Sequence, residues 1–353
     1  MNKEEKERII KGLLKCGYKK EDISDEMILG LDSTKISNLI KLSDIELNDT
    51  LSSNKKIVLD MLNINSKYFI YDIKLISNTE PYYNIMHLIN YAKSEIGRNS
   101  KYHENDMKLI ANASEEKKCE YLYNYALKKE SSYHEEDMNA IFSAKNGYVS
   151  YWGYEYAINE NAQNSKYHLS DIELIKNIDS PKVAHYLYNC ATNLVSLNSD
   201  KHESDMKLIK EAKDDDITKY LSLCACNSNS INSKYHDNDM KLISNASDHI
   251  IAKCLYECAV NKDSLNSDKH EEDMKLICGI NNVASKYLKI CIASSIILTI
   301  INIHELIRLF SNIKDEIMAK KVYNELLEKV EEKEVKYVDD GIKKSKVTVL
   351  KRL

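Results

Sequence analysis

The chain has 353 residues, 43% of them hydrophobic and 30% charged, and a formal net charge of −5. This composition is sufficient for a buried core, so a chain that is disordered throughout is excluded, and the negative charge gives no general attraction for nucleic acid or anionic lipid. With only 8 Gly and 2 Pro, the sequence favours helices joined by short polar loops over many strands.

Residues 1–64 are predicted to form degenerate N-terminal capping repeats. The stretches 21–29 and 43–47 pass from acidic to apolar residues as the later repeats do, but they lack the Tyr-His pair found there. The end of a solenoid needs a polar outer face, so its terminal repeats are expected to differ from the others.

The N-terminus and the cysteines indicate the compartment. The first residues lead into an amphipathic pattern and contain no apolar core of the kind found in signal peptides. The 9 Cys show neither the spacing of a disulfide framework nor a Cys-x-x-Cys motif. We therefore expect a cytoplasmic protein with reduced thiols.

A repeat of 34 residues organises residues 65–302. Its marker is an aspartate followed by Met or Ile, and the copies are 34 residues apart except for one step of 31 residues, from Asp106 to Asp137. The markers are Asp72, Asp106, Asp137, Asp171, Asp205, Asp239 and Asp273. A period of about 20 to 50 residues is typical of solenoids, in which each repeat buries its apolar face against its neighbours.

Each repeat is predicted to contain two helices. Counted from the marker Asp, apolar residues recur at +1, +4 and +7, as in Met240 and Ile243, which places them on one face of a first helix. After a polar loop they recur at +13, +16 and +20, as in Ala252, Leu255 and Ala259, on a second helix. Small residues there allow neighbouring helices to approach closely, and we interpret the cysteines of this helix as small hydrophobic residues.

The end of the chain departs from the repeat. Residues 303–330 are predicted to be a C-terminal capping repeat, because His304 lies 34 residues after His270 but no marker Asp follows it. Residues 331–353 are charged and are expected to form a mobile tail. The apolar run 296–301 is too short for a membrane span of about 20 residues and is predicted to be core.

A column of histidines occupies one position of the repeat, three residues before the marker: His103, His134, His168, His202, His236, His270 and His304. Successive repeats of an α-solenoid lie about 10 Å apart, whereas the ligands of one metal lie about 2 Å from it, so this spacing argues against a shared metal. We expect a structural role at the start of the first helix, in which each His exchanges hydrogen bonds with its own Asp and with free amides. No catalytic motif is found, and no catalytic residue, metal or cofactor is predicted.

A binding surface is predicted from positions at which the repeats differ. Positions +11, +14 and +18 form one face of the second helix and usually hold charged or polar residues. Four aromatic residues occupy +11 or +14 instead: Tyr83, Tyr148, Tyr151 and His185. Tyr148 and Tyr151 are the predicted anchors for a partner, because they belong to the repeat that follows the 31-residue step. Their neighbours Trp152 and Tyr154, at +15 and +17, are expected to pack between repeats.

The period of 34 and the two-helix repeat resemble those of tetratricopeptide-like, ankyrin-like and HEAT-like helical-repeat proteins. The Trp, Gly and Pro landmarks of the tetratricopeptide pattern and the Thr-Pro-Leu-His of ankyrin repeats are absent. The resemblance implies an all-α, right-handed superhelical α-solenoid of about eight two-helix repeats with degenerate caps. It further implies a non-catalytic scaffold that recognises a protein or peptide partner.

Two alternatives remain open. The period also resembles that of the DNA-reading repeats of TAL effectors, but loops such as 214–216 are acidic where those repeats carry Gly-Gly-Lys, and arginines are few. Nucleic acid is therefore the less favoured partner. The second alternative is an enzyme whose site is dispersed over several repeats.

Overall fold

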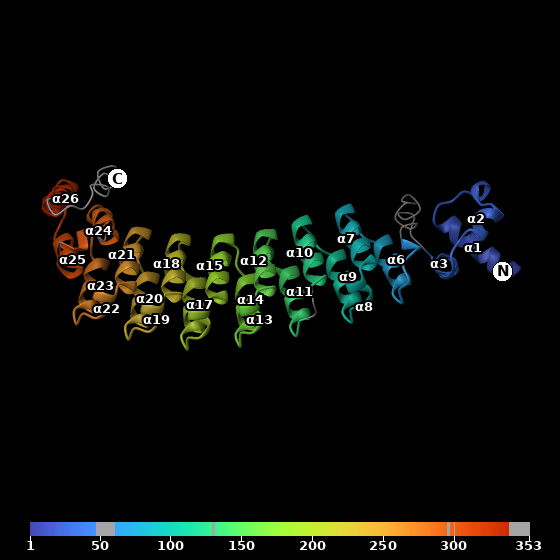
Figure 1. The fold of residues 1–353 in the computed structure, drawn as a ribbon, viewed down its shortest axis with the longest axis horizontal. Helices are drawn as coiled ribbons and strands as arrows, with labels where there is room; N and C mark the ends of the chain where they lie inside the picture. Colours follow the sequence, from blue (N-terminus) through green and yellow to red (C-terminus); the bar gives the residue numbers. More distant parts are fainter. Residues whose placement is uncertain (47–60, 129–130, 295–296, 300, 339–353) are drawn as a thin grey trace. The chain divides into compact units, whose positions relative to one another are not determined.

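The computed structural model describes residues 1–46, 61–128, 131–294, 297–299 and 301–338 (Figure 1). Within these residues it contains 24 α-helices, two short 3-10 helices and no strand. Successive helices contact their neighbours repeatedly, which is the arrangement of a helical solenoid. The predicted all-α solenoid is therefore confirmed. The contacts divide the chain into a first unit, Met1–Ala184, and a second unit, His185–Leu353.

The first unit begins with helices that precede the regular repeats. They are α1 (Lys3–Lys15), η1 (Lys20–Asp22), α2 (Asp25–Leu29) and α3 (Ser33–Ser43). Helix α1 packs closely on α3 at Gly12, where an added Cβ would lie 2.4 Å from the backbone oxygen of Leu39. Ile9 and Leu13 are buried at this crossing, which gives the N-terminal cap a core of its own.

The regular repeats of the first unit follow. Their helices are α6 (Phe69–Ser77), α7 (Tyr82–Lys93), α8 (Glu95–Asn99), α9 (His103–Ala111), α10 (Glu116–Ala126), α11 (His134–Ser143), α12 (Gly147–Ala157), α13 (Glu160–Gln163) and α14 (His168–Lys176). The second helices α7, α10 and α12 form one row, and the first helices α9, α11 and α14 form another (Figure 1). Helix α15 (Pro181–Thr192) begins in this unit and ends in the next.

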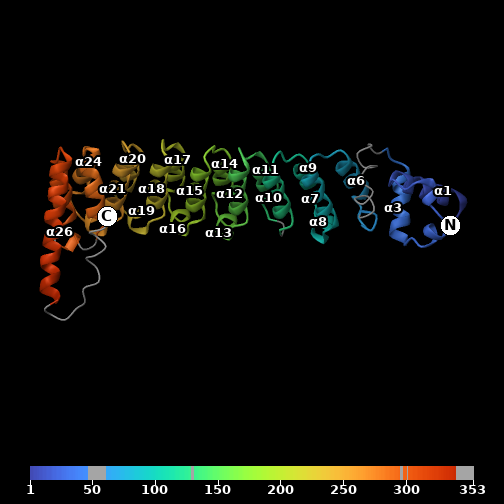
Figure 2. The same cartoon turned by 90° about the horizontal axis from the view of Figure 1, so that it is seen from above.

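The second unit continues the same pattern. Its helices are α16 (Leu194–Leu197), α17 (His202–Glu211), α18 (Asp215–Ala225), α19 (Ser228–Ile231), α20 (His236–Ser244), α21 (His249–Val260), α22 (Lys262–Leu265), α23 (His270–Cys278), α24 (Asn282–Ala293), η2 (Ile297–Thr299), α25 (Ile303–Ser311) and α26 (Glu316–Val338). Helix α26 lies beside α24 and extends beyond it (Figure 2). It therefore includes residues 331–338, which were assigned to the tail, whereas residues 339–353 lie outside the described part of the chain.

The core lies where the apolar periodicity predicts it. Met240 and Ile243 of a first helix are fully buried, as are Ala252, Leu255 and Ala259 of the following second helix. Of the apolar run 296–301, Ile297 is also fully buried, whereas residues 296 and 300 lie outside the described residues. None of the described helices has both the length and the apolar character that crossing a bilayer requires.

A short third helix, which was not predicted, completes most repeats. It has only four residues in α13, α16, α19 and α22, and asparagines bracket it. Asn227, for example, accepts hydrogen bonds from the first amides of α19, and Asn232 follows its last turn. The 31-residue step shortens this part of the repeat, because α10 ends at Ala126 and α11 already begins at His134.

Candidate functional site

The histidine column joins neighbouring repeats. In the first unit, Nε2 of His103 lies 2.6 Å from Asp72 Oδ1, and Nε2 of His168 lies 2.7 Å from Asp137 Oδ1. In the second unit, His270 bonds Asp239 in the same way at 2.9 Å. The expected structural role is supported, but the predicted partner was wrong, since each of these His bonds the Asp of the preceding repeat. The reason is that a side chain at the first residue of a helix points back beyond its own N-terminus.

Tyrosines complete this pair in the first unit. The ring of Tyr68 stacks on His103 with centroids 4.1 Å apart, and Tyr102 stacks on His134 at 4.3 Å. The hydroxyl of Tyr91, at +19 of its repeat, donates to Asp106 Oδ2 at 2.6 Å. All of the His and Asp side chains in these pairs are buried, so the contacts stabilise the stack and offer nothing to a ligand.

The second unit contains Ser, His and Asp in contact, a combination of residue types that is also found in hydrolases. Ser230 Oγ lies 3.0 Å from His236 Nδ1, and His236 Nε2 lies 3.0 Å from Asp205 Oδ2. All three side chains are buried, so the serine hydroxyl cannot reach a substrate. We assign this constellation to packing between repeats. Within the described residues there is also no group of three or more His, Cys, Asp or Glu that could hold a metal.

Helix α12 presents the two predicted anchors, and its N-terminus is held firmly. The side chain of Asn146 accepts hydrogen bonds from the amides of Tyr148 and Val149 at 3.1 and 3.0 Å. The Gly147 amide donates to Oε2 of Glu115, from the preceding repeat, at 3.1 Å. These bonds satisfy amides that would otherwise be free at the start of the helix. The position of Tyr148 is therefore set by the scaffold.

The anchors differ in exposure. The side chain of Tyr148 is 74% exposed, as predicted. Tyr151 is half-buried, because its ring lies 5.6 Å from that of Tyr121 on α10 and 4.8 Å from that of Trp152. Tyr154 stacks on Tyr121 at 5.6 Å, so the expectation that position +17 packs between repeats holds here. We call Tyr121, Tyr148, Tyr151, Trp152 and Tyr154 the aromatic surface.

The other two predicted binding residues lie on other helices. Tyr83 is half-buried on α7, which contacts α10. His185 belongs to the second unit, where its Nε2 lies 3.1 Å from Asn189 Nδ2 and its ring stacks on Tyr186 at 5.5 Å. The structure thus brings Tyr151 into a cluster with Tyr121, which the sequence analysis had not named. The signal for Tyr121 was its place at +15, one turn from +11 and +18.

Carboxylates surround the aromatic surface. Burial raises the pKa of the Tyr121 hydroxyl, Lys117 opposes this, and Glu120 and Glu155 raise the pKa further. Burial also raises the pKa of Tyr154, and again Glu155 and Glu120 add to the effect. Both glutamates therefore lie close enough to act on both rings. The surface combines aromatic rings with negative charge, which is suited to binding and supplies no nucleophile.

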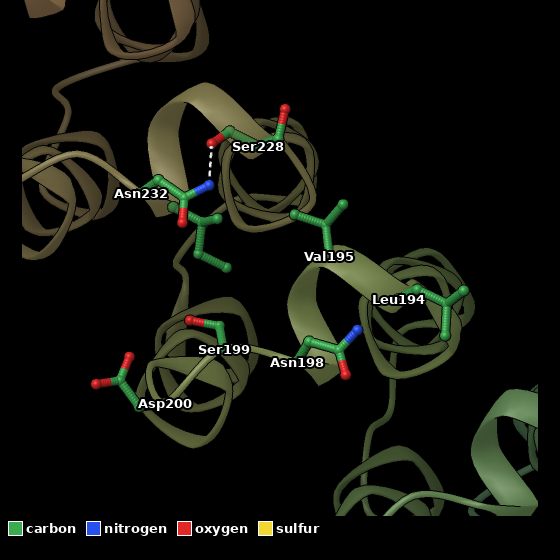
Figure 3. Close-up of a pocket in the computed structure, with 8 residues that line it drawn as sticks. Leu194, Val195, Asn198, Ser199, Asp200, Ser228 and Asn232 are labelled. Atoms are coloured by element: carbon green, nitrogen blue, oxygen red, sulfur yellow. Dashed lines mark hydrogen bonds between the residues drawn. The ribbon is translucent and has the colours of Figure 1, made fainter.

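A second concave feature lies in the second unit, between consecutive short helices. A groove of about 550 Å³ is lined by Leu194, Val195 and Asn198 on one side and by Ser228 and Asn232 on the other (Figure 3). A similar groove of about 510 Å³ separates α19 from α22. In the first groove Asn232 Nδ2 donates to the Ser228 backbone oxygen at 2.7 Å, so its amide already stabilises its own short helix. We regard these shallow polar grooves as a product of repeat stacking.

Comparison of the chain with protein-family models, with curated proteins and with solved structures found no match.

Proposed function

We propose that the protein is a non-catalytic scaffold that binds a protein or peptide partner at the aromatic surface of α10 and α12. The observation that carries the proposal is the 74% exposure of Tyr148 beside stacked aromatic rings. Aromatic side chains dominate the energy of protein interfaces, and an exposed ring fixed to a rigid helix loses little entropy on binding.

Two further features support this choice. The carboxylates beside the rings would repel phosphates, so nucleic acid is the less favoured partner. The described cysteines are free, and most are buried, in keeping with the reduced cytoplasmic compartment that we propose.

The experiment is selection of random 12-residue peptides displayed on phage, with subtraction on the double variant Tyr148→Ala/Tyr151→Ala. We expect peptides that bind the wild-type protein, with affinity lowered at least about 30-fold in the double variant, because each anchor contributes about 2 kcal/mol. The matched control is Asn232→Ala/Asn266→Ala, which alters the grooves of the second unit and should leave affinity unchanged. Peptides that bind both variants as tightly as the wild type would refute the proposal.

A further inference from the structure

We infer that the partner presents a cationic side chain, preferably arginine, to the aromatic surface. This inference rests on the proposed function, because it specifies the chemistry that the aromatic surface accepts. The site consists of the rings of Tyr121 and Tyr154 together with the carboxylates of Glu120 and Glu155. A cation above an aromatic ring is attracted by the ring's negative face, and a nearby carboxylate strengthens the attraction.

The local charge balance is negative. Helix α10 with its N-cap residue and helix α12 together carry the carboxylates Glu115, Glu116, Glu120 and Glu155 and the ammonium groups of Lys117 and Lys118. Lys118 Nζ is buried and donates to the Ala144 backbone oxygen at 2.9 Å, so it is directed away from the surface. Lys117 pairs with Glu120 at 2.9 Å in an exposed contact three residues apart. Such pairs are weak, so an incoming cation can take the place of Lys117.

The second unit shows what occupies the equivalent position when the chain supplies its own cation. Tyr121 and Tyr220 both stand at +15, and Tyr220 stacks on Tyr256 of the next repeat at 5.7 Å, as Tyr121 stacks on Tyr154. Position +14 holds Glu120 in the first unit but Lys219 in the second. The Lys219 ammonium lies 6.0 Å above the Tyr220 ring. The second unit therefore places a cation beside the aromatic pair at the position where the first unit has a carboxylate.

The chain uses the same contact elsewhere. Lysines lie 4.6 to 4.7 Å from the ring of the tyrosine that follows them at the start of several repeats, as in Lys101–Tyr102 and Lys234–Tyr235. Cations on tyrosine faces are thus a recurrent way of covering exposed rings in this protein. Arginine is preferred over lysine for the partner, because its planar guanidinium can stack on a ring while it also bonds a carboxylate.

The composition of the selected peptides tests the inference separately from the proposed function. Among peptides whose binding requires Tyr148 and Tyr151, we expect Arg, and to a lesser extent Lys, to be enriched over the unselected library. Tyrosine-dependent peptides without such enrichment would overturn the inference and leave the proposed function standing. An absence of tyrosine-dependent peptides would overturn both.

A charge variant tests the same point on one Arg-containing peptide from the selection. The variant Glu120→Gln/Glu155→Gln should lower its affinity about 10-fold, since two carboxylates beside the cation are lost. The matched control, Glu135→Gln/Glu136→Gln, removes two exposed carboxylates from α11 of the same unit and should change affinity less than twofold. Equal losses in both variants would show general attraction to an acidic protein and would overturn the inference. Circular dichroism confirms that each variant is folded.

Discussion

The repeats of the two units bury the same His–Asp pair but complete its hydrogen bonds with different residues. In the first unit position +19 is a tyrosine, and the hydroxyl of Tyr91 bonds Asp106. In the second unit +19 is a cysteine, and Asp239 and Asp273 each keep a buried oxygen without a hydrogen-bond partner among the described residues. The same stack is thus built with a fully bonded carboxylate in one place and a partly bonded one in another. The comparison teaches that the pair itself, and not its second bond, holds the repeats in register.

The units also differ on the face that is exposed. At +14 the first unit has Glu120 and Tyr151, whereas the second has Lys219 and Lys253. Burial cannot explain this change, because these residues lie at the edge of the stack. A difference at positions that stacking leaves free is the kind of difference that a binding function produces.

Removal of a fully bonded Asp should have the largest effect. Asp137 accepts hydrogen bonds from His168, Tyr125 and Gln163, so Asp137→Ala leaves several buried donors unpaired and should cost about 4 kcal/mol. Asp239→Ala leaves only the bond from His270 unmade and should cost about 2 kcal/mol. Urea unfolding monitored by hydrogen exchange in each unit measures both values. Equal losses would mean that the second carboxylate oxygen is irrelevant.

Loss of a single hydroxyl should have a smaller effect. Tyr91→Phe removes the donor to Asp106 and should cost about 2 kcal/mol, because a buried carboxylate oxygen loses a short hydrogen bond. The control Tyr235→Phe removes a hydroxyl that donates to the Ser267 backbone oxygen at 3.4 Å, which is a weak bond. It should cost less than about 0.5 kcal/mol. Thermal unfolding of the two variants distinguishes these outcomes.

The two anchor tyrosines should differ in their effect on stability. Tyr151→Ala should cost about 1 kcal/mol, because it removes ring contacts with Tyr121 and Trp152. Tyr148→Ala should leave the melting temperature unchanged, since its ring is exposed. Differential scanning calorimetry of the single variants provides the measurement. A clear loss of stability in Tyr148→Ala would place that ring in the core and remove it from the proposed surface.

The smallest expected effect is a pH dependence in the second unit. Burial raises the pKa of the Asp239 carboxyl, although the bond from His270 opposes this. A raised folded-state pKa contributes stability below the unfolded-state pKa, and that contribution is lost as the pH rises through the folded-state value. Asp239→Asn stays neutral at every pH. Its unfolding free energy relative to wild type should therefore be most favourable at pH 7 and fall by about 1 kcal/mol toward pH 4. A difference that is independent of pH between these limits would contradict the interpretation.

Much of the architecture follows from local periodicity. The marker spacing, the two main helices and the buried positions of Met240, Leu255 and Ala259 were predictable, because apolar residues that recur every three or four positions must lie on one side of a helix. The structural role of the His column was also predictable from its regular spacing. The exposure of Tyr148 followed from its place among positions that are charged in other repeats.

The contacts between repeats were not predictable in this way. His103 bonds Asp72, 31 residues earlier, and not Asp106 in its own helix, because the stacking of repeats places the earlier carboxylate in front of the ring. Tyr151 is half-buried because the same stacking places Tyr121 against it. The short third helices depend on asparagine caps rather than on apolar periodicity. Periodicity thus determined which side of each helix is buried, whereas the packing of one repeat on the next determined which residue lies against it.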